Sequence, residues 1–365
     1  MRKVVICGGH LTPALSVIDQ LKKHKGIEIL FFGRKYATEG AKNFSAEFKI
    51  ISQENIKFYG ITAGRLQRKF TKYTIPALFK TPTGFIQALI HLFILRPNII
   101  VSFGGYLSLP IVISGWLLGI KSVTHEQSSK AGLANKINSL FTEKVFLAWP
   151  QSQKDFPEKK TEVIGNPTRK TIFLKKAKNS TLNNFLKKSQ RLILVIGGNQ
   201  GSHFINQKIF DLLPSLSQFN ILHQVGTTNF MGDLDRAKKI KMSNYFALDY
   251  ISAYDIGAAL NRADLVVSRS GANTVWDLSL LGKICILIPL PFAAAKEQEE
   301  NARILERNGS CRVLKQEDTT SSKLKSTIDE LLKDLPRAKK RAVNFQKTLP
   351  KDAAEKLSNY VLSYT

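Results

Sequence analysis

Short apolar runs alternate with amphipathic stretches along most of the chain. The runs are rich in Val, Ile, Leu and Phe, which predicts buried strands, and apolar positions at helical spacing follow many of them. The predicted strands span residues 3–7, 27–32, 48–51, 99–103, 122–125, 145–148, 192–196, 221–224, 245–247, 265–268 and 284–288. Strands that alternate with helices in this way predict an α/β fold with mostly parallel, doubly wound sheets.

The alternation pauses once, which predicts two domains in these 365 residues. The pause lies near Pro167 and continues through the Lys-rich stretch 175–188. Before and after it, a strand runs into a glycine turn and a helix, at Gly8-Gly9-His10 and at 197–202. We therefore predict two Rossmann-like domains that face a cleft, 1–166 and 167–340, and a C-terminal helix in 341–365 that packs back on the first domain.

The stretch 264–277, DLVVSRSGANTVWD, predicts a strand, a tight turn and a helix start. The first N–H groups of such a helix are unpaired and, together with the helix dipole, favour a bound anion. Asp277 follows about one turn into the helix, where its carboxylate can accept hydrogen bonds from two adjacent hydroxyls, as on a ribose. A capped turn without a ligand is an equal alternative for this pattern alone.

The net charge of +26 indicates an anionic partner: nucleic acid, an acidic membrane surface or a phosphorylated substrate. No nucleic-acid-binding module is recognisable, so nucleic acid is not an expected partner. The three cysteines are widely spaced, which indicates a reducing compartment without a disulfide framework or a zinc site.

Basic and apolar residues interleave between 64 and 93, which is typical of a patch that docks on an anionic membrane surface. A core helix with a solvated face is the alternative. The residues of the predicted membrane patch are Arg68, Lys69, Lys72, Ile75, Leu78, Phe79 and Phe85. The uncharged segment 99–120 is long enough to span a bilayer, but Gly104-Gly105 and Pro110 divide it into a strand, a turn and a helix.

Several polar residues sit where parallel strands end or helices begin. His10 is a candidate general base, with a capping or packing histidine as the alternative. Glu126 follows a buried strand, and is either a second candidate base or a structural carboxylate. Arg169 can pair with a diphosphate or be a surface charge. Amide side chains such as Gln298 suit sugar hydroxyls.

Other signals argue against redox and metal chemistry. Neither glycine turn is a full G-x-G-x-x-G, and the chain has no G-x-x-x-x-G-K-[ST] loop. Asp233-Leu234-Asp235 has a metal-binding spacing, but it opens a polar helix, so we interpret it as helix capping. We expect no cofactor and no metal.

Taken in order, the motifs resemble the MurG family of peptidoglycan N-acetylglucosaminyltransferases, in glycosyltransferase family 28. They are G-G-H-x-x-P-A-L from residue 8, F-G-G-Y-x-S-x-P from 103, H-E-Q from 125, G-N-P-x-R from 165, G-G-x-Q-G from 197, S-R-S-G-A-x-T from 268 and E-Q-x-x-N-A from 297. The resemblance implies a GT-B fold. It also implies transfer of N-acetylglucosamine from UDP-N-acetylglucosamine, a substrate, to the muramoyl-pentapeptide diphospho-undecaprenol lipid on the cytoplasmic side of the cell membrane.

The resemblance also implies a role for each matching residue. Ile251 meets uracil through its backbone, Asp277 binds the ribose, and Gln298 holds the sugar. The implied donor-binding set is Ser128, Arg169, Asn199, Gln200, Gly201, Ile251, Ser270, Gly271, Ala272, Asn273, Thr274, Val275, Asp277, Gln298 and Asn301. The implied acceptor-binding set is Gly8, Gly9, His10, Gly104, Gly105 and Tyr106.

The chain departs from the family pattern at a few positions. The family's first loop, G-G-T-G-G-H, is about three residues longer than the loop here. Ser128, Asn199, Asp277 and Glu297 replace other polar residues of the pattern. The implied reaction is one direct displacement that inverts the anomeric carbon. The alternatives are another GT-B enzyme, such as a diacylglycerol glycosyltransferase or a UDP-sugar epimerase, and a non-catalytic membrane- or nucleic-acid-binding protein.

Overall fold

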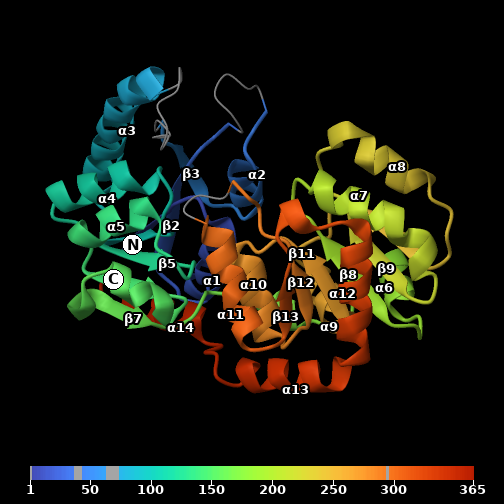
Figure 1. Cartoon of the computed structure of the whole chain (residues 1–365). Helices are drawn as coiled ribbons and strands as arrows, with labels where there is room; N and C mark the ends of the chain where they lie inside the picture. Colours follow the sequence, from blue (N-terminus) through green and yellow to red (C-terminus); the bar gives the residue numbers. More distant parts are fainter. Residues whose placement is uncertain (1, 37–42, 63–73, 293–295) are drawn as a thin grey trace. The chain divides into compact units, whose positions relative to one another are not determined.

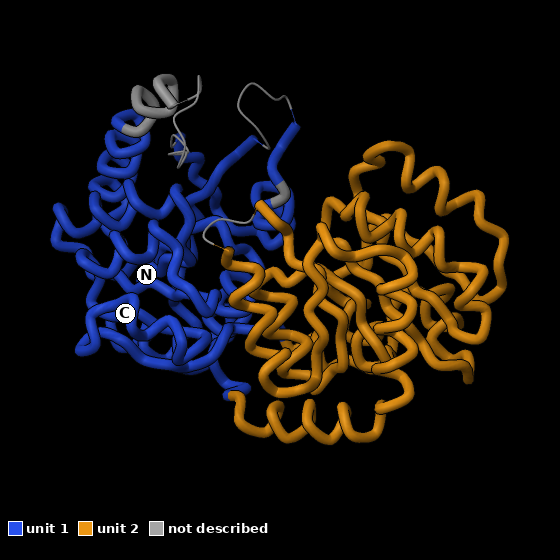
Figure 2. The backbone as a smooth tube through the Cα atoms, viewed as in Figure 1, with its two compact units in different colours: residues 1–169, 350–365 blue, residues 170–349 orange. Residues whose placement is uncertain are grey.

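The computed structural model describes residues 2–36, 43–62, 74–292 and 296–365 (Figure 1). The chain forms two compact units, shown in different colours in Figure 2: unit 1 comprises 1–169 and 350–365, and unit 2 comprises 170–349. The predicted boundaries, 166 and 341, lie near these positions but do not coincide with them. The second differs more, because the helix that contains residue 341 packs within unit 2 and the crossing back follows it.

Unit 1 is built on one parallel sheet in which β1 lies between β2 and β4. Within the described residues the sheet has seven strands in the order β3-β2-β1-β4-β5-β6-β7. Their bounds are β1 (Arg2–Cys7), β2 (Ile27–Gly33), β3 (Lys57–Gly60), β4 (Ile99–Ser102), β5 (Lys121–Glu126), β6 (Lys144–Leu147) and β7 (Thr161–Val163). At the end of β1, Cys7 is level with Phe32 of β2 and Ser102 of β4, so these three strands end at the same edge.

Helices cover both faces of this sheet (Figure 1). They are α1 (Leu11–Leu21), α2 (Ala46–Gln53), α3 (Thr74–Leu95), α4 (Ser108–Leu117), α5 (Leu133–Phe141) and α14 (Ala353–Leu362). One core cluster joins α1, α2 and α14 to the sheet, and another joins α3 and α4 to it. The C-terminal helix α14 packs against α1. No helix among the described residues has the length and apolar character that crossing a membrane requires.

The predicted strand at 48–51 is wrong, because these residues belong to helix α2. The Ser45 side chain caps the helix by accepting from the Phe48 N–H at 3.0 Å, and Glu47 lies in the first turn, where a negative charge suits the helix dipole. Ile51 faces the core one turn after Phe48. The third strand is instead β3, a few residues further on.

Unit 2 repeats the same architecture. Its described residues form six parallel strands in the order β10-β9-β8-β11-β12-β13, the 3-2-1-4-5-6 order of a doubly wound sheet. The strands are β8 (Leu192–Ile196), β9 (Asn220–Gln224), β10 (Tyr245–Leu248), β11 (Leu265–Ser268), β12 (Cys285–Leu287) and β13 (Cys311–Val313). The predicted α/β fold with two doubly wound Rossmann-like units is confirmed by these two sheets.

The helices of unit 2 also lie on both faces of the sheet. They are α6 (Ser180–Leu186), α7 (His203–Leu212), α8 (Asp233–Lys239), α9 (Ile256–Arg262), α10 (Ala272–Leu280), α11 (Glu297–Arg307), α12 (Ser321–Lys333) and α13 (Leu335–Gln346). A single core cluster joins α7, α8, α12 and α13 to the strands. Three helices, α7, α10 and α11, begin shortly after the strands β8, β11 and β12, so their free N–H groups lie at the edge where the strands end.

In unit 1 the loop after β1 touches the loop after β4. The Gly9 N–H donates to the Gly104 carbonyl at 3.0 Å. Gly8 has a φ of +123°, and a Cβ atom there would lie 2.7 Å from the Gly104 carbonyl oxygen and 2.8 Å from the Phe103 carbonyl carbon. Only glycine fits this position, because both the backbone angle and the contact with the second loop exclude a side chain.

We expect Gly8→Ala to lower the free energy of unfolding of the chain by about 3 kcal/mol or more, since it adds a backbone clash to a strained φ. Gly26→Ala is the matched control, because Gly26 also has a positive φ of +83° but has no atom within 4 Å of an added Cβ. The control should cost only about 1–2 kcal/mol. Urea unfolding followed by circular dichroism measures both, and equal costs would contradict the close approach of the two loops.

Candidate active site

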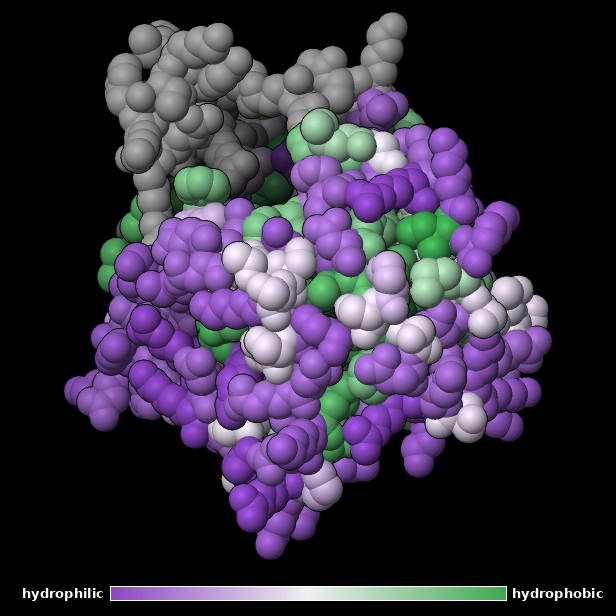
Figure 3. Space-filling view, turned by 45° about the vertical axis from the view of Figure 1, so that its right-hand side comes forward, coloured by the Kyte–Doolittle hydropathy of each residue, from purple (hydrophilic) through white to green (hydrophobic). Residues whose placement is uncertain are grey.

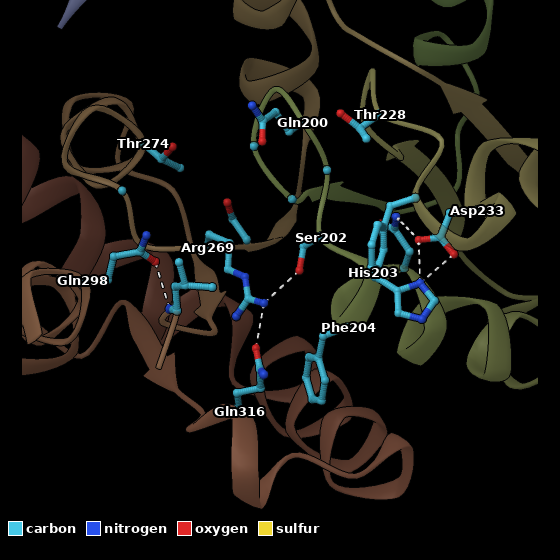
Figure 4. Close-up of a pocket in the computed structure, with 18 of the residues that line it drawn as sticks. Gln200, Ser202, His203, Phe204, Thr228, Asp233, Arg269, Thr274, Gln298 and Gln316 are labelled. Carbon is cyan, nitrogen blue, oxygen red and sulfur yellow. Dashed lines mark hydrogen bonds and ion pairs between the residues drawn. The ribbon is translucent and has the colours of Figure 1, made fainter. Parts of the chain in front are cut away.

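A cavity of about 530 Å³ opens in unit 2 at the edge where the strands end. Figure 4 shows that Thr274 and Gln298 line it from one side and His203 and Asp233 from the other. The starts of α7, α10 and α11 all contribute to the lining, so unpaired N–H groups of three helices lie around it. Such a cavity suits a negatively charged, hydroxyl-rich ligand.

Arg269 supplies a fixed positive charge to this cavity. Its guanidinium donates to the Ser202 hydroxyl at 2.9 Å and to the Gln316 side-chain oxygen at 2.7 Å (Figure 4). It also donates to the carbonyls of Ile288 and Pro289. Burial lowers the pKa of Arg269 to about 10, so the group stays charged at neutral pH. The sequence analysis assigned no role to Arg269, although it lies inside the motif S-R-S-G-A.

Five residues of the implied donor-binding set line the cavity: Gln200, Gly201, Gly271, Thr274 and Gln298. They come from three separate motifs, and the fold brings them together. The Gln298 side-chain oxygen accepts from the Leu290 N–H at 3.0 Å, which fixes the amide and leaves its NH₂ group as a donor for a ligand. The resemblance gives all five to the donor, with Thr274 against the diphosphate and ribose and Gln298 on the sugar.

The residues implied for the nucleoside lie outside the lining of this cavity. The Ile251 N–H donates to the Gln224 side-chain oxygen at 2.9 Å, so this backbone donor is already paired within unit 2. Asn199 is exposed, and its carbonyl accepts from the Thr227 N–H. The remaining implied donor residues of unit 2 lie in or beside α10 and α11: Ser270, Ala272, Asn273, Val275, Asp277 and Asn301.

Asp277 differs from the other carboxylates of unit 2. Burial raises the pKa of its carboxyl group to about 7. Among the described residues no group donates a hydrogen bond to it, and Ser270, at the turn before the same helix, carries a buried hydroxyl without a partner. Hydroxyl donors of a ligand would satisfy this carboxyl, as the sequence analysis predicts for a ribose.

In unit 1 the predicted acceptor residues come together where the two glycine loops touch. Gly8 and Gly9 contact Gly104 and Gly105, and the Tyr106 hydroxyl lies 3.5 Å from an Arg34 guanidinium nitrogen. His10 immediately precedes α1 and does not cap the helix with its side chain. Burial lowers the pKa of His10 to about 4, so its imidazole is neutral at pH 7 and able to accept a proton.

Glu126 is held by its own loop. Its buried carboxylate accepts from the N–H groups of Ser128 and Gly132, both at 2.9 Å, and from the Asn135 side chain at 3.0 Å. These bonds fix the loop after β5 and favour the structural alternative for Glu126. Ser128 of the implied donor set also takes part in this loop through its backbone.

Arg169 is paired within unit 1. Its guanidinium donates to the Asp19 carboxylate at 2.8 and 3.2 Å and approaches the Glu54 carboxylate at 3.4 Å. Asp19 lies on α1 and Glu54 follows α2. Two carboxylates thus already pair with this cation, whose side chain is 16% exposed, so it is not the surface charge of the alternative.

The interpretation of Asp233 as a capping residue is wrong. Its carboxylate does not cap α8 but reaches α7, where it accepts from the His203 ring at 2.9 Å and from Asn206 and Gln207 at 2.8 Å. The sequence offers no local signal for this contact, because the partners are about 30 residues apart. No group of three or more potential metal ligands occurs in the described parts of the chain.

The predicted membrane patch is only partly described. Arg68, Lys69 and Lys72 lie outside the described residues, as do the side chains of Ile75, Leu78 and Phe79 on α3. Phe85 is partly buried. The same helix continues with an exposed apolar row after it, formed by Ile86, Ile90, Phe93 and Ile94, which are 52–69% exposed.

Comparison with known proteins decides the family. Residues 7–147 match the glycosyltransferase family 28 N-terminal domain, and residues 192–357 match the C-terminal domain of that family. The chain belongs to glycosyltransferase family 28. The two matches cover the two loops of unit 1 and the cavity of unit 2, so both candidate sites lie in family domains.

Relatives match the chain over nearly its whole length. A UDP-N-acetylglucosamine–N-acetylmuramyl-(pentapeptide) pyrophosphoryl-undecaprenol N-acetylglucosamine transferase from Halothermothrix orenii is 34% identical over 92% of this chain and 90% of its own length. A protein of the same name from Listeria monocytogenes is 30% identical over 98% of this chain and 96% of its own length. The match to these transferases therefore covers nine tenths or more of both chains and not one domain alone.

Solved structures confirm the GT-B glycosyltransferase fold. The crystal structure of Acinetobacter baumannii MurG matches with a TM-score of 0.73 and 23% identity over the full length of both chains. A UDP-GlcNAc 2-epimerase from Neisseria meningitidis, solved with UDP-GlcNAc bound, matches with a TM-score of 0.69 and 12% identity.

We expect Asp277→Asn to raise the free energy of unfolding by about 1–3 kcal/mol at pH 8. The pKa of Asp277 is higher in the folded chain than in the unfolded chain, so ionisation destabilises the fold. This cost is complete above pH 7 and fades as the pH falls from 7 toward 4. Urea unfolding at pH 8 and pH 5 measures the difference, with exposed Asp318→Asn as the control. A gain for Asp277→Asn that does not change with pH would contradict the raised pKa.

Proposed function

We propose that the chain transfers N-acetylglucosamine from UDP-N-acetylglucosamine to the muramoyl-pentapeptide diphospho-undecaprenol lipid. This step of peptidoglycan synthesis serves cell wall biogenesis, and with it cell shape and division. The observation that carries the proposal is the match to relatives named for this reaction over about nine tenths of both chains. The cavity in unit 2 supports it, because helix starts, Arg269 and Gln298 suit a nucleotide sugar.

The proposed reaction is a single displacement. His10 takes the proton from the acceptor hydroxyl, whose oxygen forms the new bond to the anomeric carbon as the bond to UDP breaks on the opposite face. The configuration at that carbon inverts. The charge on the leaving diphosphate is stabilised by helix-start N–H groups and by Arg269, so the proposal requires neither a cofactor nor a metal.

Asp277 would bind the donor through the ribose. Two adjacent hydroxyls that donate to its carboxylate would supply hydrogen bonds that no described residue of the chain gives to it. Neutral His10 and ionised Asp277 are both needed, which fits a reaction near or above neutral pH, because the pKa values are about 4 and about 7.

We further propose that unit 1 docks on the cytoplasmic side of the cell membrane, where the lipid acceptor is found. The exposed row on α3 is apolar, and Arg96 at the end of that helix lies over the Phe93 ring, 5.6 Å from its centre. A strongly basic chain is attracted to anionic lipid. The face brought forward in Figure 3 is mostly hydrophilic, with its hydrophobic residues in small separate areas.

The reaction is tested by transfer of radiolabelled N-acetylglucosamine from the UDP donor to a short-chain analogue of the lipid acceptor. We expect the wild-type chain to form product and His10→Ala to lower kcat about a hundredfold or more, the usual scale for loss of a general base. His24→Ala is the control, because His24 is an exposed histidine of the same unit. Product from diacylglycerol instead, or product at the same rate from His10→Ala, would contradict the acceptor or the base.

Membrane docking is tested by sedimentation with vesicles that contain anionic phospholipid. We expect Ile90→Asp combined with Ile94→Asp to reduce the bound fraction at least about tenfold, because two charges would enter the apolar row. Leu140→Asp is the control, because Leu140 is an exposed apolar residue on another helix of unit 1, α5. Equal losses in both variants, or no loss in the α3 variant, would contradict docking through α3.

A further inference from the structure

The cavity wall opposite Thr274 and Gln298 carries a histidine–carboxylate pair that the proposed reaction does not yet use (Figure 4). His203 is the first residue of α7 and Asp233 the first of α8. The His203 Nδ1 atom lies 2.9 and 3.0 Å from the two Asp233 oxygens. The His203 side chain is 34% exposed, whereas that of Asp233 is 2% exposed.

The contacts of the pair decide where its proton is. The Asp233 carboxylate accepts from Asn206 and Gln207, each at 2.8 Å, and these amide groups act there as donors. An ionised carboxylate can only accept, so Nδ1 of His203 carries a proton and donates it to Asp233. Nε2 is then the remaining polar atom of the ring, and no described residue bonds to it. Since His203 lines the cavity, Nε2 is available to a ligand.

A buried chain of hydrogen bonds fixes the carboxylate. Burial lowers the pKa of His223 to about 3, so this ring is neutral. Its Nε2 donates to the Asn206 side-chain oxygen at 3.0 Å, and its Nδ1 accepts from the Tyr245 hydroxyl at 3.0 Å. Asn206 in turn donates to Asp233 and to the Val225 carbonyl. Each member has one possible orientation, so Asp233 holds the His203 ring in a preset position.

We propose that His203 donates a hydrogen bond from Nε2 to the diphosphate of the donor and of the leaving UDP; this role rests on the proposed function. Because Nδ1 already donates to Asp233, Nε2 donates only when the ring takes up a second proton, which solvent supplies as the anionic diphosphate binds beside the start of α7. As the bond to the anomeric carbon breaks, its electron pair stays on the β-phosphate oxygen, and the Nε2 proton stays on His203 and bonds more strongly to the added charge.

Titration calorimetry of the whole chain with uridine, UDP and UDP-N-acetylglucosamine tests this role. We expect His203→Gln to raise the Kd for UDP and for UDP-N-acetylglucosamine about tenfold or more, the usual effect of losing a charge-assisted hydrogen bond. The Kd for uridine should not change. His24→Gln, at the exposed histidine of unit 1, should bind all three ligands as the wild type does. Asp233→Asn should also weaken the binding of UDP, because the His203 ring loses its charged partner. The thermal unfolding of this variant is measured alongside.

Three results would overturn the inference. Unchanged UDP affinity in His203→Gln would mean that the ring does not contact the diphosphate. A loss of affinity for UDP-N-acetylglucosamine alone would mean that the His203 ring contacts the sugar. An equal loss of affinity for uridine would indicate a general disturbance of unit 2. A wild-type chain that binds no UDP would overturn the proposed function itself, whereas normal wild-type binding with an unaffected variant would overturn only the role of His203.

Discussion

The parallel pairing of the strands is the constraint on which the rest of this structure depends. Parallel strands end at one edge of the sheet, and each crossover helix begins near that edge with N–H groups that no carbonyl of its own helix can reach. In unit 2 this places the starts of α7, α10 and α11 around one cavity. Residues from 197 to 316 meet there because of the topology, although they are far apart along the chain. The same rule brings the two glycine loops of unit 1 into contact.

The carboxylates of Glu126, Asp233 and Asp277 differ in the number of hydrogen-bond donors that the chain provides to them. Glu126 and Asp233 are both buried, and each accepts hydrogen bonds from at least three groups of the chain, so burial costs them little. Asp277 is partly buried and its carboxyl accepts no hydrogen bond from a described residue, and this burial raises the pKa of that carboxyl to about 7. A ligand whose hydroxyls donate to this carboxyl, as proposed for the ribose, would offset that cost.

Much of the fold and part of the site could be predicted from the sequence, because both depend on local patterns. The strand at 192–196 is a continuous apolar run, and the motif that follows it lines the cavity through Gln200 and Gly201. The prediction failed at 48–51, where the same apolar residues suit a strand or a helix and the Ser45 cap decides. The pairs of Arg169 with Asp19 and of His203 with Asp233 were beyond reach, since their partners lie 150 and 30 residues apart and only the folded chain joins them.

Arg269 and the His203–Asp233 pair provide different kinds of hydrogen-bond donor to the cavity. The Arg269 guanidinium is held by four neutral oxygen atoms, so its position and its charge are set before any ligand binds. A fixed charge of this kind needs no rearrangement when negative charge develops on the leaving diphosphate, which is the role that the proposed reaction gives to Arg269. The His203 ring donates from Nδ1 to the buried Asp233 carboxylate. The proposed hydrogen bond from its Nε2 to the diphosphate would strengthen as negative charge grows on the leaving oxygen. Interactions that grow in this way lower the barrier, so Arg269 and the His203–Asp233 pair would both favour the transition state over the bound donor.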